Sequence, residues 1–261
     1  MTNSLTVYGH PASQPSRTVF WTCLLNNLPF ALGNAPGGVA GTGGTNPRGQ
    51  VPSILDDGFN LAEACAIACY LCDKHGADDL YPKALQARAR IDQFLHMHHG
   101  LVRLSTLKLM APYVVKPLGG SLGGGGNPLS ILQNEMLASA FAADDPLTNG
   151  GRVIHAIAGF LEESYFNDAT PFVCNTDSAS IADLVCYSEL GQLRIANLFD
   201  FDGYPKTQRW LDEMTTVSHH DTIHAYNVHL GDIATTPNTM ERFSAAADAG
   251  FAALRETGLA T

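Results

Sequence analysis

The sequence is short of charge, and above all of positive charge. Only 15% of its 261 residues are Asp, Glu, Lys or Arg, whereas ~25% is usual in soluble proteins. The 15 Lys and Arg residues face 25 Asp and Glu residues, which gives a formal net charge of -10. Proteins that bind nucleic acid by counterion release need clustered Lys and Arg. The composition therefore argues against a nucleic-acid partner.

Long apolar runs are missing as well. No stretch approaches the ~20 apolar residues of a membrane-spanning helix, and the start, MTNSLTVYGHP, has neither a basic nor a long apolar segment. We therefore expect no membrane association and no secretion. Six cysteines in a chain of this length are typical of reduced thiols in a cytoplasmic protein. With 45% hydrophobic residues the chain can bury enough apolar surface to fold.

The first 80 residues switch between strand and helix periodicity. Short strands are expected at residues 5–8, 29–32, 51–55 and 58–60, and the last two are joined by a tight turn at Asp56-Asp57-Gly58. Helices are expected from Pro15 onward and at residues 62–74. The order β-α-β followed by β-β-α is the thioredoxin-like arrangement, which we predict for residues 1–78.

From residue 84 onward the apolar pattern is helical. Helices are expected at residues 84–107, 129–141, 153–166, 181–197, 204–217 and 239–256. In the last of these, Phe243, Ala247, Phe251 and Leu254 fall on one stripe, so this helix should pack back onto the body. The predicted fold is α/β plus all-α, with the thioredoxin-like domain followed by a helical bundle at residues 84–261.

The first candidate site is the run Ser13-Gln14-Pro15-Ser16-Arg17 after the first strand. A hydroxyl just ahead of a helix faces unpaired N–H groups and the positive end of the helix dipole, and this environment favours an anion such as a thiolate. On its own, a serine in this position is more often a simple helix cap.

Two further segments follow in a suggestive order. In Asn46-Pro47-Arg48-Gly49-Gln50-Val51-Pro52, the Val-Pro step at a strand start fits a cis proline, which leaves main-chain groups free to bind an extended peptide. Glu63 then opens a helix, where it suits a ligand amine, although on its own a first-turn acid that complements the dipole is the favoured interpretation. Occurring together, the three elements favour the binding interpretation.

Over nearly its full length the chain resembles a theta-class glutathione transferase. The resemblance rests on SQPSR (13–17), NPRGQVP (46–52), LAEACAI (61–67), YPKALQARARID (81–92), HHGLVR (98–103) and SIADL (180–184). In the last segment, Ser180 and Asp183 also form a capping box ahead of an apolar helix. The resemblance implies a cytoplasmic homodimer that conjugates glutathione to a small electrophile, with glutathione peroxidase activity as a further expectation. Glutathione is then a co-substrate, and no metal or redox cofactor is expected.

The resemblance also implies roles for individual residues. Ser13 is the expected catalytic residue, because its position matches the serine whose hydroxyl donates a hydrogen bond to the glutathione sulfur. The expected substrate-binding residues are Gln50, Val51, Pro52, Glu63, Ala64 and Arg103. Lowering a thiol pKa from ~8.5 to ~6.5 takes ~2.7 kcal/mol, and a hydrogen bond to an anion supplies ~1.5–3 kcal/mol. A serine and a helix terminus therefore suffice without a general base.

The chain departs from the family pattern in two places. Ala64 stands where a serine is usual, which removes one hydroxyl contact to glutathione. Residues 33–44, GNAPGGVAGTGG, replace a charged segment that contacts the glycine carboxylate and contain no Lys, Arg or His. Arg48 and Arg103 are the candidate replacements. These departures keep open the alternative of a non-catalytic glutathione-transferase-like module for ligand binding or assembly. A thiol oxidoreductase is disfavoured, because that group has a cysteine at the position of Ser13.

Several other features favour structural interpretations. Cys65, Cys69 and Cys72 follow helical spacing, which favours core packing over redox chemistry. Tyr8 is a second candidate for the sulfur contact, but its place inside a strand favours packing. The glycine-rich residues 119–126 indicate a connection. Solvated or packed side chains are also favoured over a metal site for two groups of histidines: His96, His98 and His99, and His219, His220, His224 and His229.

Overall fold

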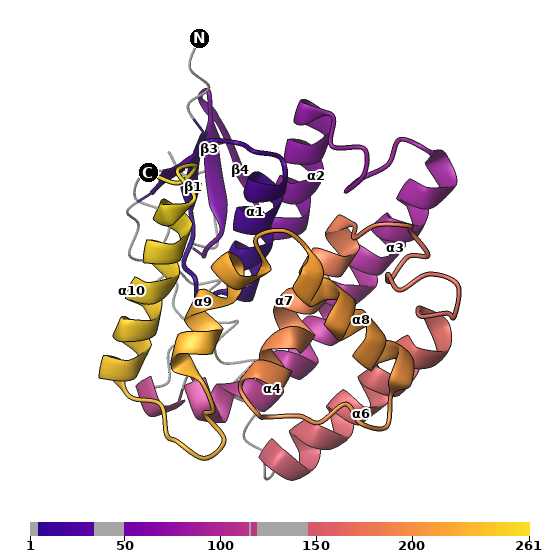
Figure 1. Ribbon diagram of the computed structural model, residues 1–261, viewed down its shortest axis with the longest axis vertical. Coiled ribbons are helices and arrows are strands. Elements are labelled where there is room, and N and C mark those ends of the chain that lie inside the picture. Colours follow the sequence, from indigo (N-terminus) through magenta and orange to yellow (C-terminus); the bar gives the residue numbers. More distant parts are fainter. Residues whose placement is uncertain (1–4, 34–49, 115, 119–145) are drawn as a thin grey trace.

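A computed structural model describes residues 5–33, 50–114, 116–118 and 146–261 of the protein (Figure 1). The helix expected at residues 129–141 lies outside the described residues. So do Arg48, the glycine-rich residues 119–126, and all of the 33–44 segment except Gly33.

The N-terminal part is a four-stranded sheet with two helices. The strands are β1 (Leu5–Tyr8), β2 (Ala31–Leu32), β3 (Ser53–Asp56) and β4 (Phe59–Ala62), in the order β2-β1-β3-β4. β1 runs parallel to β2, and β3 is antiparallel to both β1 and β4. Helices α1 (Gln14–Leu25) and α2 (Ala64–His75) lie side by side on one face of the sheet (Figure 1). This is the predicted thioredoxin-like arrangement.

The turn between β3 and β4 confirms the expected hairpin. Asp57 and Gly58 both have positive φ, 48° and 88°, as a two-residue turn between antiparallel strands requires. At the other end of the helix that follows, Gly76 takes a left-handed conformation with φ 69° and ends α2. Residues suited to positive φ thus determine where the β3–β4 hairpin turns and where α2 ends.

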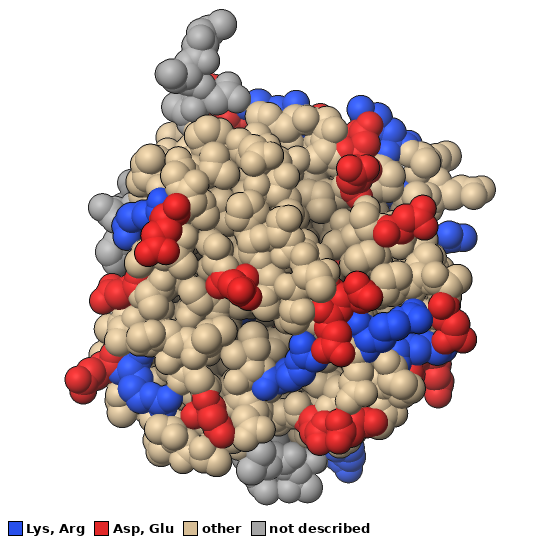
Figure 2. Space-filling view, in the orientation of Figure 1, with Lys and Arg blue, Asp and Glu red and all other residues tan. Residues whose placement is uncertain are grey.

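The second part of the chain is helical, as predicted. Its elements are α3 (Leu85–Gly100), α4 (Val102–Val114), the 3-10 turn η1 (Lys116–Leu118), α6 (Pro146–Ser164), α7 (Ile181–Ile195), α8 (Pro205–Thr216), α9 (His220–Leu230) and α10 (Met240–Glu256). In the described part of the chain, none of these helices is long and apolar enough to cross a membrane. On the face drawn in Figure 2, acidic and basic side chains are interspersed in a mostly uncharged surface.

The structure differs from the sequence prediction in two helical regions. The single helix expected at residues 84–107 is broken at Leu101, which has φ -119° and follows Gly100, a residue type that favours helix poorly. Helix α9 is not predicted by the apolar pattern. Its β-branched residues and three histidines lower the helical signal, and packing against α10 stabilises it instead.

Helix α7 is the centre of the helical part, and every residue from Ile181 to Leu193 is buried. The predicted capping box is present, with the Ser180 N–H donating to Asp183 at 2.8 Å, and the Ser180 hydroxyl donates to the same carboxylate at 2.8 Å. The Asp183 carboxylate also accepts from the Val173 N–H at 2.8 Å and from the Trp210 indole at 3.0 Å. Burial raises the pKa of Asp183 while these donors oppose the rise.

The two parts of the chain are joined through α1 and α7. The fully buried Arg17 donates to the Pro11 carbonyl at 2.9 Å, and to the Ser188 carbonyl and the Gln192 amide oxygen, each at 2.8 Å. Burial lowers the pKa of Arg17 to about 10. These bonds fix the first turn of α1 against the helical part.

The chain end returns to the sheet. The Phe30 N–H donates to the Leu259 carbonyl and the Leu32 N–H donates to the Thr261 carbonyl, each at 2.8 Å, in a parallel bridge between Phe30 and Ala260. Helix α10 packs along α9 before this return, as the stripe on the expected helix 239–256 predicts (Figure 1).

Candidate functional site

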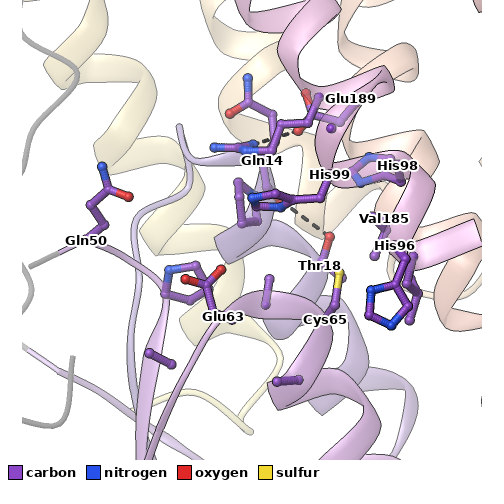
Figure 3. Close-up of a pocket in the computed structure, with 18 of the residues that line it drawn as sticks. Gln14, Thr18, Gln50, Glu63, Cys65, His96, His98, His99, Val185 and Glu189 are labelled. Atoms are coloured by element: carbon purple, nitrogen blue, oxygen red, sulfur yellow. Dashed lines mark hydrogen bonds and ion pairs between the residues drawn. The ribbon is translucent and has the colours of Figure 1, made fainter. Parts of the chain in front are cut away.

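A cavity of about 890 Å³ opens between the sheet-bearing part and the helical part. The start of α2 and the segment before β3 form one wall, which we call the N-terminal wall. Helices α3, α4 and α7 form the other, the helical wall. Figure 3 shows Gln50 and Glu63 on one side of this space, with His96, His98 and Val185 across from them.

The N-terminal wall contains five of the predicted binding residues: Gln50, Val51, Pro52, Glu63 and Ala64. The Val51-Pro52 peptide is cis, as the Val-Pro step predicts. Glu63 precedes the first turn of α2 with φ 73°, a conformation that costs ~1–3 kcal/mol for a residue other than glycine. Such strain is concentrated at binding sites, because a folded structure keeps it where it holds a functional group in place.

The first turn of α1 forms the corner between the two walls. Gln14, Pro15 and Thr18 line the cavity, whereas Ser13, the predicted catalytic residue, is not among the lining residues. The Ser13 hydroxyl oxygen caps α1 by accepting from the Ser16 N–H at 3.3 Å. The predicted cap is therefore present, and the role of Ser13 toward sulfur stays a prediction.

Tyr8, the second candidate for the sulfur contact, does not line the cavity either. Its ring packs against the backbone of Gly33, where an added Cβ would collide with the ring atoms. The structure thus gives Tyr8 the packing role that its place in β1 predicts.

The helical wall carries a buried ion pair. Arg103, the sixth predicted binding residue, lies 2.7 Å from Glu189, whose side chain is only 2% exposed. The Thr106 hydroxyl donates a short hydrogen bond to the same carboxylate. The positive charge of Arg103 is therefore balanced within the protein, while 22% of its side chain stays accessible beside the cavity.

Three histidines of the helical wall were missed as site residues. His96, His98 and His99 all line the cavity, whereas the sequence interpretation treats them only as solvated or packed side chains. His96 and His99 are three residues apart and so share one face of α3, but nothing in the sequence indicates which face meets the cavity. His98 is buried, and burial lowers its pKa to about 3, so its ring is neutral.

The other histidine group contains both packed and exposed members, as the sequence interpretation of solvated or packed side chains predicts, and His229 is exposed. His224 is fully buried and its ring meets those of Trp21 and Tyr187 edge-on. His220 pairs with the Tyr187 hydroxyl at 2.8 Å. In the described ranges, no three His, Cys, Asp or Glu side chains are grouped so that they could hold a metal ion.

The cysteine stripe of α2 divides between core and cavity. Cys72 is buried, as core packing predicts, but the half-buried Cys65 and Cys69 line the cavity. Burial raises the pKa of Cys65 to about 12 and that of Cys69 to about 11. Both thiols therefore stay protonated at neutral pH and are poor nucleophiles.

Comparison with known proteins points in the same direction as this geometry. Residues 7–79 match the family model for the glutathione S-transferase N-terminal domain. The chain is 30% identical to glutathione S-transferase theta-1 of Rattus norvegicus over 79% of its own length and 80% of that protein. It is 29% identical to glutathione S-transferase T1 of Arabidopsis thaliana, covering 84% of this chain and 87% of that one. Glutathione S-transferase T2 of Arabidopsis thaliana, also 29% identical, is longer, and the chain spans 36% of it.

Solved structures agree on the fold. Human glutathione transferase theta-2, in complex with glutathione and an unknown ligand, superposes with a TM-score of 0.66 at 23% identity, covering 97% of this chain and 99% of that one. The apo form of human glutathione S-transferase T1-1 gives 0.65 at 25% identity, with 97% and 100% covered.

Proposed function

The chain belongs to the theta class of glutathione S-transferases, and on that premise we propose how its own residues perform the transfer. Glutathione lies along the N-terminal wall with its sulfur at the first turn of α1, and the electrophile lies against the helical wall. The observation that carries the proposal is a continuous cavity of about 890 Å³ that joins Gln50, Val51, Pro52, Glu63 and Ala64 to the start of α1 and to Arg103.

Each end of the tripeptide has a suitable partner on the N-terminal wall. The Glu63 carboxylate suits the γ-glutamyl amine, and the first N–H groups of α2 suit the neighbouring carboxylate. The backbone of Val51, ahead of the cis proline, suits the extended main chain of the peptide. This wall recognises the constant part of the substrate mainly through main-chain groups.

Ser13 is the proposed catalytic residue. Its cap hydrogen bond uses a lone pair of the hydroxyl oxygen, which leaves the hydroxyl hydrogen to donate to the glutathione sulfur. That bond and the positive end of α1 stabilise the thiolate. The thiolate sulfur then attacks an electrophilic carbon, and the leaving group departs with its electron pair. Glutathione is the co-substrate, and the step needs neither a metal nor a redox cofactor.

The protein's own thiols support this assignment. Cys65 and Cys69 line the cavity, but their raised pKa keeps both protonated. Neither cysteine is thus suited to supply the reactive thiolate, which fits the proposal that the thiolate belongs to bound glutathione, with its sulfur at the start of α1. A serine at that position, in place of a cysteine, favours transfer over thiol–disulfide exchange.

The test is Ser13→Ala, with Ser16→Ala as the matched control one turn along. Glutathione binding is measured by calorimetric titration, and conjugation is measured with an alkyl halide, an aryl halide and an epoxide. We expect Ser13→Ala to lose ~10²-fold in kcat/KM, as for other single donors to a reacting anion, while glutathione still binds. Unchanged conjugation with glutathione bound would rule out the serine mechanism. Absence of glutathione binding in the wild type would favour the non-catalytic module.

We also propose that the protein is a cytoplasmic homodimer. Two large apolar side chains support an interface, since Phe59 on β4 is 49% exposed and Leu85 on α3 is 82% exposed. The six free cysteines fit a reducing compartment. Light scattering after size exclusion should give twice the mass of one chain, and Phe59→Glu should shift that mass toward the monomer.

A further inference from the structure

The loop between β1 and α1 is shaped by one side chain, His10. The His10 carbonyl accepts from the Ser13 N–H at 2.9 Å, and its ring nitrogen Nδ1 accepts from the Ala12 N–H at 3.1 Å. The second bond spans two residues, as an Asn or Asp side chain does in an Asx-turn. His10 thus fixes the residues that lead directly into Ser13.

The His10 ring is in turn held by α10, from the far end of the sequence. Phe243 stacks on it, with ring centroids 5.6 Å apart and planes 7° from parallel. Phe251 meets it edge-on at 5.5 Å and 86°. Between them, Gly250 lies so close to the same loop that an added Cβ would be 2.6 Å from the Pro11 side chain. The loop and α10 therefore pack closely against each other.

Helix α10 is anchored independently of this contact. The Arg242 guanidinium donates to the Thr236 carbonyl at 2.7 Å and to the Pro237 carbonyl at 3.0 Å. Beyond the helix, the chain end pairs with Phe30, the residue before β2, through a parallel bridge to Ala260. Because both ends of α10 are tied down, the two phenylalanines are a fixed support for the His10 ring.

We propose that His10 is a positioning residue for Ser13, held in place by Phe243 and Phe251. This inference rests on the proposed role of Ser13. A hydroxyl that stabilises a thiolate must keep its position to within a fraction of an ångström, because a 1 Å misplacement can lower the rate ~10²-fold. His10 acts through the backbone of the loop and does not touch the substrate. Burial lowers the pKa of His10, which keeps Nδ1 available as an acceptor at neutral pH.

Two substitutions at His10 separate the acceptor from the ring. His10→Asn keeps an acceptor oxygen near the place of Nδ1 and loses the ring, whereas His10→Phe keeps the ring and loses the acceptor. The double variant Phe243→Leu with Phe251→Leu removes the support and leaves His10 intact. Phe160→Leu is the control, because Phe160 is a partly exposed phenylalanine of α6 that contacts Tyr165, away from α10.

The decisive readout is the thiol pKa of bound glutathione, taken from its thiolate absorbance against pH, together with kcat, KM and glutathione affinity. We expect His10→Phe to raise that pKa and to lower kcat at least tenfold, with glutathione affinity within twofold of wild type. His10→Asn should recover most of the loss, the double variant should fall between them, and Phe160→Leu should match wild type.

A purely structural role for His10 would give a different result. In that case the melting temperature falls in the His10 and phenylalanine variants while the bound thiol pKa stays at the wild-type value, and the inference is overturned. If His10→Phe does not fold, His10→Asn and the double variant decide the question by the same readout. Failure of the serine mechanism is seen separately, because Ser13→Ala would then leave the bound thiol pKa unchanged.

Discussion

The two walls of the cavity are built in different ways. The N-terminal wall takes its shape from two short stretches, Gln50 to Pro52 and Glu63 to Ala64, and its main features are a cis peptide and a helix start. The helical wall takes single side chains from α3, α4 and α7, among them His99, Arg103 and Glu189. A wall of main-chain groups suits a constant ligand, whereas a wall of side chains from separate helices can be changed one residue at a time. This division fits an enzyme with one fixed co-substrate and a variable electrophile.

The first prediction, with the largest expected effect, asks whether Arg103 serves the helical wall without contributing to glutathione binding. Arg103→Ala removes the ion-pair partner of the buried Glu189 carboxylate and leaves it the hydrogen bond from the Thr106 hydroxyl. Removing one partner of a buried ion pair lowers the stability by ~3 kcal/mol or more. We expect urea unfolding to show that loss and conjugation to fall, while calorimetry gives an unchanged glutathione affinity.

The control for Arg103 removes both charges. Arg103→Leu together with Glu189→Leu should recover most of the stability, because no unpaired carboxylate then remains. If Arg103→Ala instead weakens glutathione binding tenfold, the arginine also serves the N-terminal wall and the division between the walls fails.

The second prediction concerns the protonation of the helical wall. His98 has a pKa of about 3 in the folded protein, whereas an unfolded histidine has a pKa of ~6.5. Below ~6.5 the unfolded chain therefore takes up a proton that the folded protein refuses, and stability falls as the pH falls toward 3. Between pH 7 and pH 4.5 the expected loss from His98 is about 2 to 3 kcal/mol.

His98→Phe should remove this loss. Neither ring nitrogen of His98 has a hydrogen-bond partner within the described structure, so the variant should be as stable as wild type at pH 7. Urea unfolding at the two pH values measures the difference, and Phe94→Leu, which changes the neighbouring ring, controls for packing. An equal pH dependence in His98→Phe and wild type would contradict the prediction.

The same contrast explains which parts of the site the sequence predicts. Turns, caps and the cis proline depend on neighbours along the chain, so Asp57-Gly58, the Ser180–Asp183 box and Val51-Pro52 are all predicted correctly. The theta-class assignment was likewise available from short motifs. The cavity role of His96, His98 and His99 was not, because it depends on how α3 packs across from α2. The break at Leu101 was missed because it interrupts a stretch whose apolar pattern continues on both sides.

The third prediction tests the charge of the N-terminal wall. Glu63→Gln removes the proposed partner of the γ-glutamyl amine, and we expect KM for glutathione to rise ~10-fold with kcat at saturation unchanged, as for lost ground-state binding. Asp92→Asn is the matched control, since Asp92 also lines the cavity but accepts a hydrogen bond from the Tyr81 hydroxyl at 2.7 Å. A fall in kcat with unchanged KM would move Glu63 from binding to chemistry.

The smallest expected effect concerns Ala64, where the chain departs from the family pattern. Ala64→Ser adds a hydroxyl at the first residue of α2, inside the cavity. A net hydrogen bond is worth ~0.5–1.5 kcal/mol, so glutathione should bind about threefold to tenfold more tightly. Ala66→Ser, two residues along and also lining the cavity, should change the affinity by less than twofold. If both variants bind glutathione like wild type, a side-chain hydroxyl adds nothing here, and the main-chain N–H groups of α2 already satisfy the γ-glutamyl carboxylate. Recognition of the γ-glutamyl end at the start of α2 would then rest on main-chain groups and Glu63, and the contrast with the side chains of the helical wall would be sharper than the sequence implies.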